Sequence, residues 1–449
     1  MPIRFLTIAT FIFLIFCNPA HATSSEFTFV VNAPGEGVAQ ILASSPGSSW
    51  ADSGAEAAVA TLNVDGKYNQ DIVIDRGPEP QTYSVFLGPV QPGKHKLQIE
   101  RSAKWSAAAT QLIIHDVKVR IVTAGESECD AIAHAPIIYA RADTLGHFSD
   151  VPLLMWYEHS MHGATNTLLY SVVFSNEDSG TPTDALMARW GRATDIEYIY
   201  RVTVGANRQV ENEIFQGIEH DDRPFRGMKI GQHPLILVAT PNNCFADSGF
   251  SPVQYHLLPV SQDLSQHSRE ELMDRFPWTY SIMAQELMRE KKVRQFGASA
   301  GDAISDPRNY LYFEIEADNN QSGLVIWVKL KGHPTWYGSS RGRPGLVISR
   351  SGWYRTTVEL PVGTRPESLE FIGLESADLR PSSLFDSDEA PDSSKAASTL
   401  RNVSKVFFLD SQYRPGPNVF EMHRVVTFHP GDMTTFVPGA SKQRYGSNP

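Results

Sequence analysis

The chain has 449 residues, of which 20% are charged and 41% hydrophobic, and its 39 Lys and Arg against 50 Asp and Glu give a net charge of −11 at pH 7. This length predicts two or three domains of roughly 100–200 residues, and the near-average hydrophobic fraction excludes a chain that is disordered throughout. The acidic balance argues against non-specific nucleic-acid binding, which needs clustered Lys and Arg to displace counterions from phosphates.

Residues 1–22 have the three-part pattern of a secretory signal peptide. Arg4 precedes an apolar run over residues 5–16, Pro19 interrupts it, and Ala20 and Ala22 are the small residues that a signal peptidase recognises. The run is too short to span a hydrocarbon core of ~30 Å, and no later segment reaches the roughly 18 apolar residues of a membrane helix. We therefore expect a secreted or periplasmic protein without a membrane span, an uncleaved anchor being the alternative.

Short β segments punctuated by Gly, Pro and Asn predict a mainly β, multi-domain protein. In this interpretation β-sandwich domains, immunoglobulin-like or jelly-roll, flank a β-rich middle domain with two helices. The predicted divisions are a signal peptide (1–22), an N-terminal β-sandwich (23–126), the middle domain (127–293), a C-terminal β domain (294–440) with a mobile loop at 375–399, and a tail (441–449).

The predicted strands follow in chain order. In the N-terminal domain they are residues 27–31, 57–64, 71–74, 83–87, 95–99 and 109–122. In the middle domain they are residues 135–140, 153–157, 168–174, 196–204, 210–215, 235–239 and 253–260. In the C-terminal domain they are residues 310–316, 324–330, 345–349, 354–360, 369–374, 405–409 and 423–428.

Two helices are predicted within the middle domain. Thr181 is the expected N-cap of the first helix, and Gly191 its end. The second helix begins at the capping-box segment 268–271 and extends to the basic residues 289–292. Pro277 lies inside this segment and must kink the helix or split it in two, because proline removes a backbone hydrogen bond and clashes with the preceding turn.

Cys129 and Cys244, both in the middle domain, could form one disulfide, because an exported protein reaches an oxidising compartment. Two buried thiols are the alternative that the sequence leaves open.

Histidine is concentrated between residues 130 and 260. His159 and His162 lie where a predicted strand gives way to a hairpin, and His220, Asp221 and Asp222 form a second polar group in a later loop. Neutral imidazole and carboxylate suit Zn²⁺ and related ions, so these residues are candidate ligands of a divalent metal that activates water for hydrolysis. No other cofactor is indicated, and the alternative interpretation is that both groups are solvated loop residues.

Asp195 and Glu197 are candidate catalytic carboxyls. They are two residues apart in a predicted strand and therefore face the same side, roughly 7 Å apart along the backbone. Such a spacing could suit a general acid and a base on either side of a glycosidic bond. The simpler alternative is the solvent-facing side of an amphipathic strand, with Arg201 as an ion-pair partner.

A glycine-rich segment of the C-terminal domain supplies candidate ligand-binding residues: Trp336, Tyr337, Arg341 and Arg343. Exposed aromatic rings could stack on sugar rings, and arginine could hold hydroxyl or acidic groups. Trp327 and Trp353 are instead expected to fill the core of this domain.

The sequences Ala135-Pro136-Ile137-Ile138-Tyr139 and Trp190-Gly191-Arg192-Ala193-Thr194-Asp195-Ile196-Glu197 resemble segments of the vacuolar protein sorting-associated (DUF946-type) family. That family has a similar opening strand and a later Gly-Asp-Trp-Glu segment, which Thr194 and Ile196 interrupt here. The resemblance covers about 80 residues of the middle domain and assigns no catalytic residue.

The first functional hypothesis is an exported protein that binds a polymer or a cell-envelope component, most plausibly carbohydrate. The second is a glycan or ester hydrolase that could use a metal ion, with the middle domain catalytic. The third is a structural envelope protein. Signatures of α/β-hydrolases, P-loop enzymes and protein kinases do not occur in the sequence.

Overall fold

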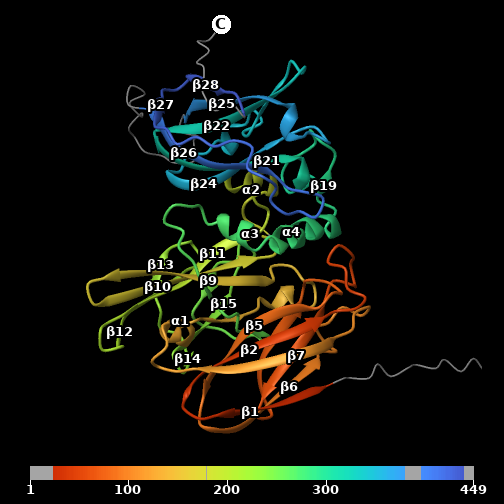
Figure 1. Cartoon of the computed structure of the whole chain (residues 1–449), viewed down its shortest axis with the longest axis vertical. Helices are drawn as coiled ribbons and strands as arrows, with labels where there is room; N and C mark the ends of the chain where they lie inside the picture. Colours follow the sequence, from red (N-terminus) through yellow and green to blue (C-terminus); the bar gives the residue numbers. More distant parts are fainter. Residues whose placement is uncertain (1–23, 178, 380–395, 439–449) are drawn as a thin grey trace, which may run out of the picture.

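The computed structural model describes residues 24–177, 179–379 and 396–438. The predicted signal peptide and the predicted tail lie outside these residues. In Figure 1 the chain forms an elongated molecule, with the first β-rich unit at the bottom, the last at the top and two helices near the middle. The mainly β, multi-domain fold that the sequence predicts is confirmed. Within the described residues no helix is long and apolar enough to cross a membrane.

The N-terminal unit is a two-layered β-sandwich. Its strands are β1 (Ser25–Val31), β2 (Gly35–Ser44), β3 (Ala58–Val64), β4 (Lys67–Ile74), β5 (Gln81–Val90), β6 (Gly93–Arg101) and β7 (Ile113–Val122). One sheet has the order β1-β6-β3-β4 and the other β5-β2-β7. Alternate residues such as Ile41, Leu62 and Leu97 point inward and are fully buried between the layers. The central strand β2 was not predicted, because Gly35 and Gly37 weaken its strand pattern.

Two further sheets build the middle unit. Its elements are α1 (Cys129–Ala133), β8 (Ile137–Tyr139), β9 (Pro152–His162), β10 (Thr165–Phe174), α2 (Thr183–Trp190), β11 (Asp195–Val204), β12 (Val210–Gln216), β13 (Asp222–Pro224), β14 (Lys229–Ile230), β15 (His233–Val238), β16 (Phe245–Ala246), β17 (Gln254–Tyr255), β18 (Val260–Ser261), α3 (Glu271–Arg275) and α4 (Trp278–Arg289), with a 3₁₀ turn at Ala142–Thr144. One sheet has the order β13-β12-β11-β10-β9-β18, and the other β14-β15-β8-β17 with β16 beside β15.

The two predicted helices are present, with one correction at a cap. Gly191 ends α2 in the left-handed conformation, at φ 64°, as the sequence predicts. Pro182, not Thr181, occupies the N-cap of α2, and it provides no side-chain cap. Pro277 splits the second predicted helix into α3 and α4. The predicted strand 253–260 is likewise divided, into β17 and β18.

The C-terminal unit is a second sandwich, whose sheets have the orders β24-β21-β26-β27 and β23-β22-β25-β28. Its elements are β19 (Val293–Arg294), β20 (Ile304–Ser305), β21 (Tyr310–Asn320), β22 (Ser322–Leu330), β23 (Trp336–Gly338), β24 (Gly352–Glu359), β25 (Leu369–Asp378), β26 (Ala397–Phe408), β27 (Val426–Phe428) and β28 (Met433–Phe436), with 3₁₀ turns at Pro307–Asn309, Pro344–Leu346 and Pro366–Ser368.

Two predictions for the C-terminal unit need correction. The 3₁₀ turn at Pro344–Leu346 replaces part of the strand predicted at 345–349, because proline begins this turn. The predicted loop 375–399 is strand at both ends, in β25 and β26, where pairing with β22 and β21 fixes the backbone. Its central part, residues 380–395, lies outside the described residues.

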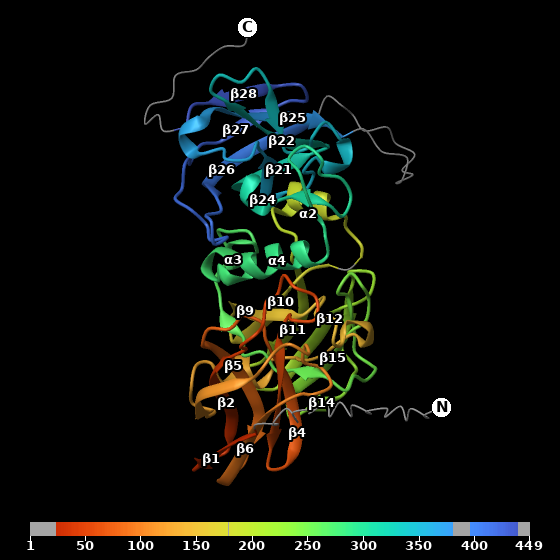
Figure 2. The same ribbon diagram turned by 90° about the vertical axis from the view of Figure 1, so that its right-hand side faces the viewer.

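Helix α2 comes from the middle of the chain but packs on the C-terminal sandwich. The hydroxyls of Thr356 and Thr357 on β24 donate to the carbonyl oxygens of Ala188 and Met187, at 2.6 and 2.7 Å. Figure 2 shows α2 beside β24, with α3 and α4 between them and the sheets below. The helices therefore connect the middle sheets to the C-terminal sandwich.

Arg355 on β24 is the most deeply buried charge at this junction, with no exposed surface. Its guanidinium donates to Asp274 of α3 at 2.7 Å and to Glu314 of β21 at 2.9 Å. It also donates to the Tyr280 hydroxyl of α4 at 2.6 Å. A Cβ at Gly191 would lie 2.5 Å from Arg355 Cγ, so the end of α2 is closed tightly over this side chain. Arg355 thus links the helices α3 and α4 to the strands β21 and β24.

Replacing Arg355 by methionine should lower the free energy of unfolding by about 3–5 kcal/mol, because Glu314 would remain buried without a paired cation and Asp274 would keep only Lys405, at 2.7 Å. Urea denaturation measures this difference. The matched control is Arg401→Met, which removes an exposed ion pair with Asp318 and should cost less than about 1 kcal/mol. Equal effects of the two substitutions would contradict a structural role for the buried pair.

Candidate functional site

A cavity of about 490 Å³ lies where the middle sheets meet the C-terminal sandwich. Its walls come from six separate parts of the chain: the loop between β10 and α2, the segment from α2 into β11, the β12–β13 loop, the β15–β16 loop, the segment before α3, and the segment leading into β24. The residues of these walls that carry chemistry are Glu177, Trp190, Arg192, Asp195, Glu197, His220, Arg269, Glu270, Arg350 and Trp353. We call this space the junction cavity.

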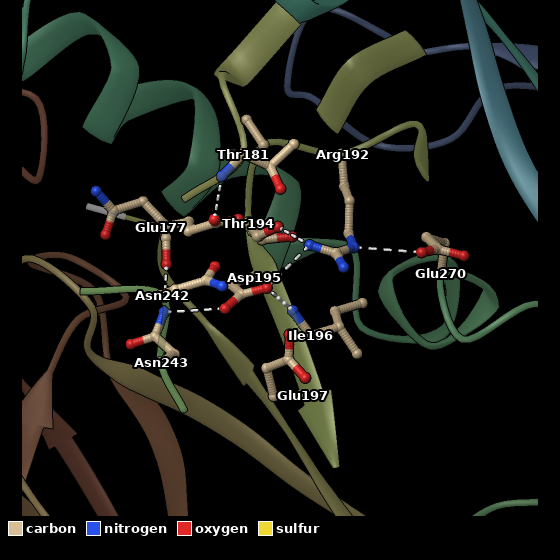
Figure 3. A network of polar contacts seen from close by, with 12 residues as sticks. Glu177, Thr181, Arg192, Thr194, Asp195, Ile196, Glu197, Asn242, Asn243 and Glu270 are labelled. Carbon is tan, nitrogen blue, oxygen red and sulfur yellow. Dashed lines mark hydrogen bonds and ion pairs between the residues drawn. The ribbon is translucent and has the colours of Figure 1, made fainter. Parts of the chain in front are cut away.

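Asp195 is the first residue of β11 and is buried in the floor of the junction cavity. It accepts hydrogen bonds from Asn243 Nδ2 at 3.1 Å and from its neighbour's backbone, Ile196 N, at 2.8 Å, and it pairs with Arg192 at 3.4 Å (Figure 3). Burial raises the pKa of Asp195, against the lowering effect of the Arg192 charge. The alternative that this residue faces solvent is therefore wrong, because α2 and the C-terminal sandwich cover the end of β11.

Glu197 lies two residues further along β11 and also lines the cavity. Burial, together with the charge of Asp195, raises the pKa of Glu197 to about 8. Gln216 Nε2 donates to its carboxyl at 2.6 Å. The suggested partner Arg201 instead pairs with Asp222, at 2.6 Å. The predicted carboxyl pair thus occupies a cavity, with Glu197 holding a proton at neutral pH.

Glu177 closes another side of the junction cavity. Its carboxyl accepts a hydrogen bond from the backbone N–H of Thr181 at 2.6 Å, which holds the start of the loop into α2 (Figure 3). Burial and the neighbouring charge of Asp195 raise the pKa of Glu177 to about 7. Two acids of the cavity are therefore able to exchange protons near neutral pH.

The pKa of Glu270, at the N-cap position of α3, is shifted in the opposite direction from the pKa values of Glu177 and Glu197. Burial acts to raise its pKa, but the charges of Arg192, Arg350 and Arg355 outweigh burial and leave the pKa lowered. Arg192 Nε lies 3.2 Å from Glu270 and joins it across the cavity to Asp195 (Figure 3). The cavity therefore contains an ionised carboxylate on one wall and a protonated carboxyl on another.

Two tryptophans and a half-buried arginine form the wall next to the C-terminal sandwich. The guanidinium carbon of Arg350 lies 4.9 Å from the ring centroid of Trp190 and 5.2 Å from that of Tyr354. Trp353 lines the cavity, with its ring 6.0 Å from that of His267. The expectation that Trp353 fills the core is wrong, since adjacent strand residues face opposite sides and its neighbour Tyr354 is the one fully buried.

The candidate metal ligands are not brought together. Strand β9 continues through His162, so His159 and His162 lie exposed on the β9–β10 hairpin. Asp221 pairs instead with Arg223, at 2.8 Å, and Asp222 with Arg201. In the residues that the structure describes, no three His, Cys, Asp or Glu side chains lie close enough to hold a metal ion.

His220 belongs to the junction cavity rather than to a metal centre. Its Nδ1 lies 3.8 Å from the Glu197 carboxyl and 2.7 Å from Gln216 Nε2. Cys244 Sγ is 3.5 Å from His220 Nε2. The cavity therefore presents a histidine beside a protonated acid, an arrangement that the sequence pattern did not predict.

Both candidate disulfide cysteines are free thiols. Cys129 begins the short helix α1, whereas Cys244 is buried between β15 and β16. Burial raises the pKa of Cys244 to about 11, so this thiol stays protonated beside His220 and is a poor nucleophile.

The candidate ligand-binding residues of the C-terminal domain lie outside the junction cavity. Trp336 of β23 is half-buried and stacks on Phe371, with ring centroids 6.4 Å apart. Tyr337 packs against the core of the sandwich. Arg341 and Arg343 both pair with Asp184 of α2. A ligand-contact role for these four residues stays a prediction.

Trp327, which was also expected in the core, is only half-buried. Its indole N–H donates to the Glu375 carboxyl at 2.5 Å. This side chain therefore lies on the outer face of the sheet rather than between the sheets, where its neighbours Ile326 and Val328 are buried.

Comparison with known proteins adds little beyond the fold. No family model and no curated protein matches the chain. A family 35 carbohydrate binding module from an environmental isolate is 18% identical over 22% of this chain and 66% of its own, with a TM-score of 0.17. The EclA C-terminal domain, a sugar-binding protein, is 15% identical over 26% of this chain and 83% of its own, with a TM-score of 0.16.

A family two carbohydrate esterase from Clostridium thermocellum is 13% identical over 29% of this chain and 33% of its own, with a TM-score of 0.15. The chain thus spans about a third of the length of that esterase, and slightly under two thirds of the binding module. At these scores the similarities carry no argument about activity, and the resemblance to the vacuolar protein sorting-associated family stays a prediction.

The raised pKa of Glu197 predicts a pH dependence of stability. The folded protein binds this proton more tightly than the unfolded chain, in which the ordinary pKa of a glutamate carboxyl is about 4.5. The contribution of Glu197 to the free energy of unfolding therefore decreases as pH rises from about 4.5 to about 8. Glu197→Gln removes the titration, so the variant should gain roughly 2–4 kcal/mol relative to the wild type between pH 5 and 8.

Denaturant unfolding at a series of pH values provides the measurement. The matched control is Glu219→Gln, which changes an exposed carboxylate in the loop beside His220 and should leave the pH profile as in the wild type. Parallel profiles for the wild type and Glu197→Gln would contradict burial of a protonated Glu197.

Proposed function

We propose that this protein is an exported saccharide-binding protein and that the junction cavity is its binding site. The observation that carries the proposal is the composition of the cavity walls: tryptophan on one side, and arginine, carboxyl and amide groups on the other, around about 490 Å³. Small-molecule sites have volumes of ~300–1,000 Å³ and combine apolar surface with a few converging polar groups.

The chemistry of a sugar ring fits these walls. Its C–H faces pack against aromatic rings, a surface that Trp353 supplies here. Its hydroxyl groups both donate and accept hydrogen bonds, and the cavity has charged acceptors such as Glu270 and charged donors such as Arg192. Hydrogen bonds to charged groups contribute roughly 1.5–3 kcal/mol each when they are shielded from water.

Glycan hydrolysis is a second candidate function, favoured by the contrast between two carboxyls of the cavity. Glu197 is protonated at neutral pH, and Glu270 is ionised. A pair of carboxyls with pKa values moved apart by their surroundings is the requirement for a general acid and its partner at a glycosidic bond. In this candidate mechanism Glu197 donates its proton to the leaving oxygen as the glycosidic C–O bond breaks, and Glu270 stabilises the positive charge that develops on the sugar. A water molecule then adds to the anomeric carbon and returns a proton to Glu197. Of the predicted pair, Glu197 thus takes the acid role. Asp195 is held in the floor of the cavity by Arg192 and Asn243 and acts as a positioning residue.

Trp353→Ala should lower saccharide affinity at least tenfold, because stacking on an aromatic face would be lost. The measurement is a glycan array followed by calorimetric titration with the glycan that the wild-type protein binds. Trp336→Ala serves as the comparison, since this half-buried tryptophan lies outside the cavity. The saccharide affinity of this variant should equal that of the wild type. Loss of binding in Trp336→Ala alone would overturn the cavity as the site and favour the β23 region. A wild-type protein that binds no glycan would favour a structural envelope role.

If the protein hydrolyses its glycan, Glu197→Gln should bind with about wild-type affinity and lose turnover by a factor of roughly 10² or more, as expected when a general acid is removed. Release of reducing ends measures turnover, and the same titration measures binding. Full turnover in this variant would eliminate Glu197 as the acid while leaving the binding proposal intact.

A further inference from the structure

We propose that the junction cavity selects an anionic sugar unit, one that carries a carboxylate or a sulfate, and that Arg350 and Arg269 hold its charge. This inference rests on the proposed saccharide-binding function and names the class of ligand. It is based on two arginines of the cavity wall that form no ion pair within the residues that the structure describes.

Arg350 is the inner of the two cations. Its guanidinium lies against Trp190 and Tyr354 and donates a hydrogen bond to the Arg189 carbonyl oxygen. Within the described parts of the chain it forms no ion pair, although it lines the cavity. Burial lowers its pKa only to about 10, so it stays charged at neutral pH. A half-buried cation without a partner is costly unless an anion binds beside it.

Arg269 is the outer cation, exposed in the segment that leads into α3. It also forms no ion pair among the residues that the structure describes. The neighbouring residue, Glu270, is already paired with Arg192 at 3.2 Å. Arg269 is therefore free to hold an incoming anion at the entrance, with a hydrogen-bonding fork that matches carboxylate and sulfate oxygens.

The remaining charges of the cavity do not cancel these two arginines. The Arg192 charge is opposed by Glu270 and Asp195, which both lie within ion-pair distance. Burial raises the pKa of Glu197 to about 8, so this carboxyl is mainly protonated at pH 7, and it raises the pKa of Glu177 to about 7, so that carboxyl is about half protonated. The cavity is thus positively charged inside a protein whose net charge is −11, and only local complementarity can attract an anion to it.

The ring and the charge of such a sugar would have separate partners. The ring lies against Trp353, and the acidic substituent points toward the guanidinium groups of Arg350 and Arg269. The protonated Glu197 then donates to an oxygen of the same ligand without repelling its charge, as an ionised carboxylate would. A neutral sugar would satisfy the aromatic wall and leave both arginines unpaired.

The test compares glycans that differ only in charge: oligogalacturonate and hyaluronan oligosaccharides against their methyl esters, and chondroitin sulfate against desulfated chondroitin. The full-length mature protein should bind at least one charged member about tenfold or more tightly than its neutral or less charged partner. Arg269→Gln and Arg350→Lys should each reduce this preference. Arg226→Gln, which changes an exposed arginine of the β13–β14 segment, should retain it.

The possible outcomes separate this inference from the function on which it rests. Binding of neutral glycans with equal or higher affinity would overturn the anionic preference and support the saccharide site. Binding of no glycan at all would overturn both. A preference that both variants retain would overturn the assignment to Arg350 and Arg269. Preference for the sulfated or for the carboxylated member identifies the anion and supports the inference in either case. Because Arg269 is exposed, its variant keeps the test valid even if Arg350→Lys is poorly folded, which thermal unfolding would reveal.

Discussion

The buried charge of Arg355 is the constraint on which the position of the candidate site depends. The guanidinium has no exposed surface, and its partners Asp274 and Glu314 lie on a helix of the middle unit and on a strand of the C-terminal sandwich. Breaking such a pair leaves uncompensated charge in a medium of low polarity. The helices and the sandwich are therefore held in one arrangement, which brings Glu270 and Trp353 to the same cavity as the strand β11.

That arrangement also explains the unusual protonation of the site. If the middle unit stood alone, the first residues of β11 would be exposed to solvent, because they lie at the end of the strand. The covering by α2 and the C-terminal sandwich removes water from Asp195 and Glu197, and desolvation raises their pKa values. On the opposite wall three arginines surround Glu270 and keep it ionised. Packing between units, rather than any single motif, thus creates the contrast between the two carboxyls.

Sequence patterns predicted the local features of this molecule well and the assembled site only in part. Alternation and turn residues located most strands, and Pro277 and Gly191 marked real helix boundaries, since these signals act over a few residues. Asp195 and Glu197, which the spacing predicts on one face of a strand, both line the junction cavity. Their burial could not be predicted, because the C-terminal sandwich, which covers them together with α2, begins more than a hundred residues further along the chain. Trp353 was misassigned for a related reason: only one of two adjacent aromatic residues can face the core, and the sequence does not say which.

The central claim is that a saccharide occupies the junction cavity, and a crystal structure of the protein with its bound glycan tests it most directly. The account predicts a sugar ring against Trp353, with a ring substituent within hydrogen-bonding distance of Glu197. A glycan bound instead at Trp336, with the cavity filled only by water, would contradict it.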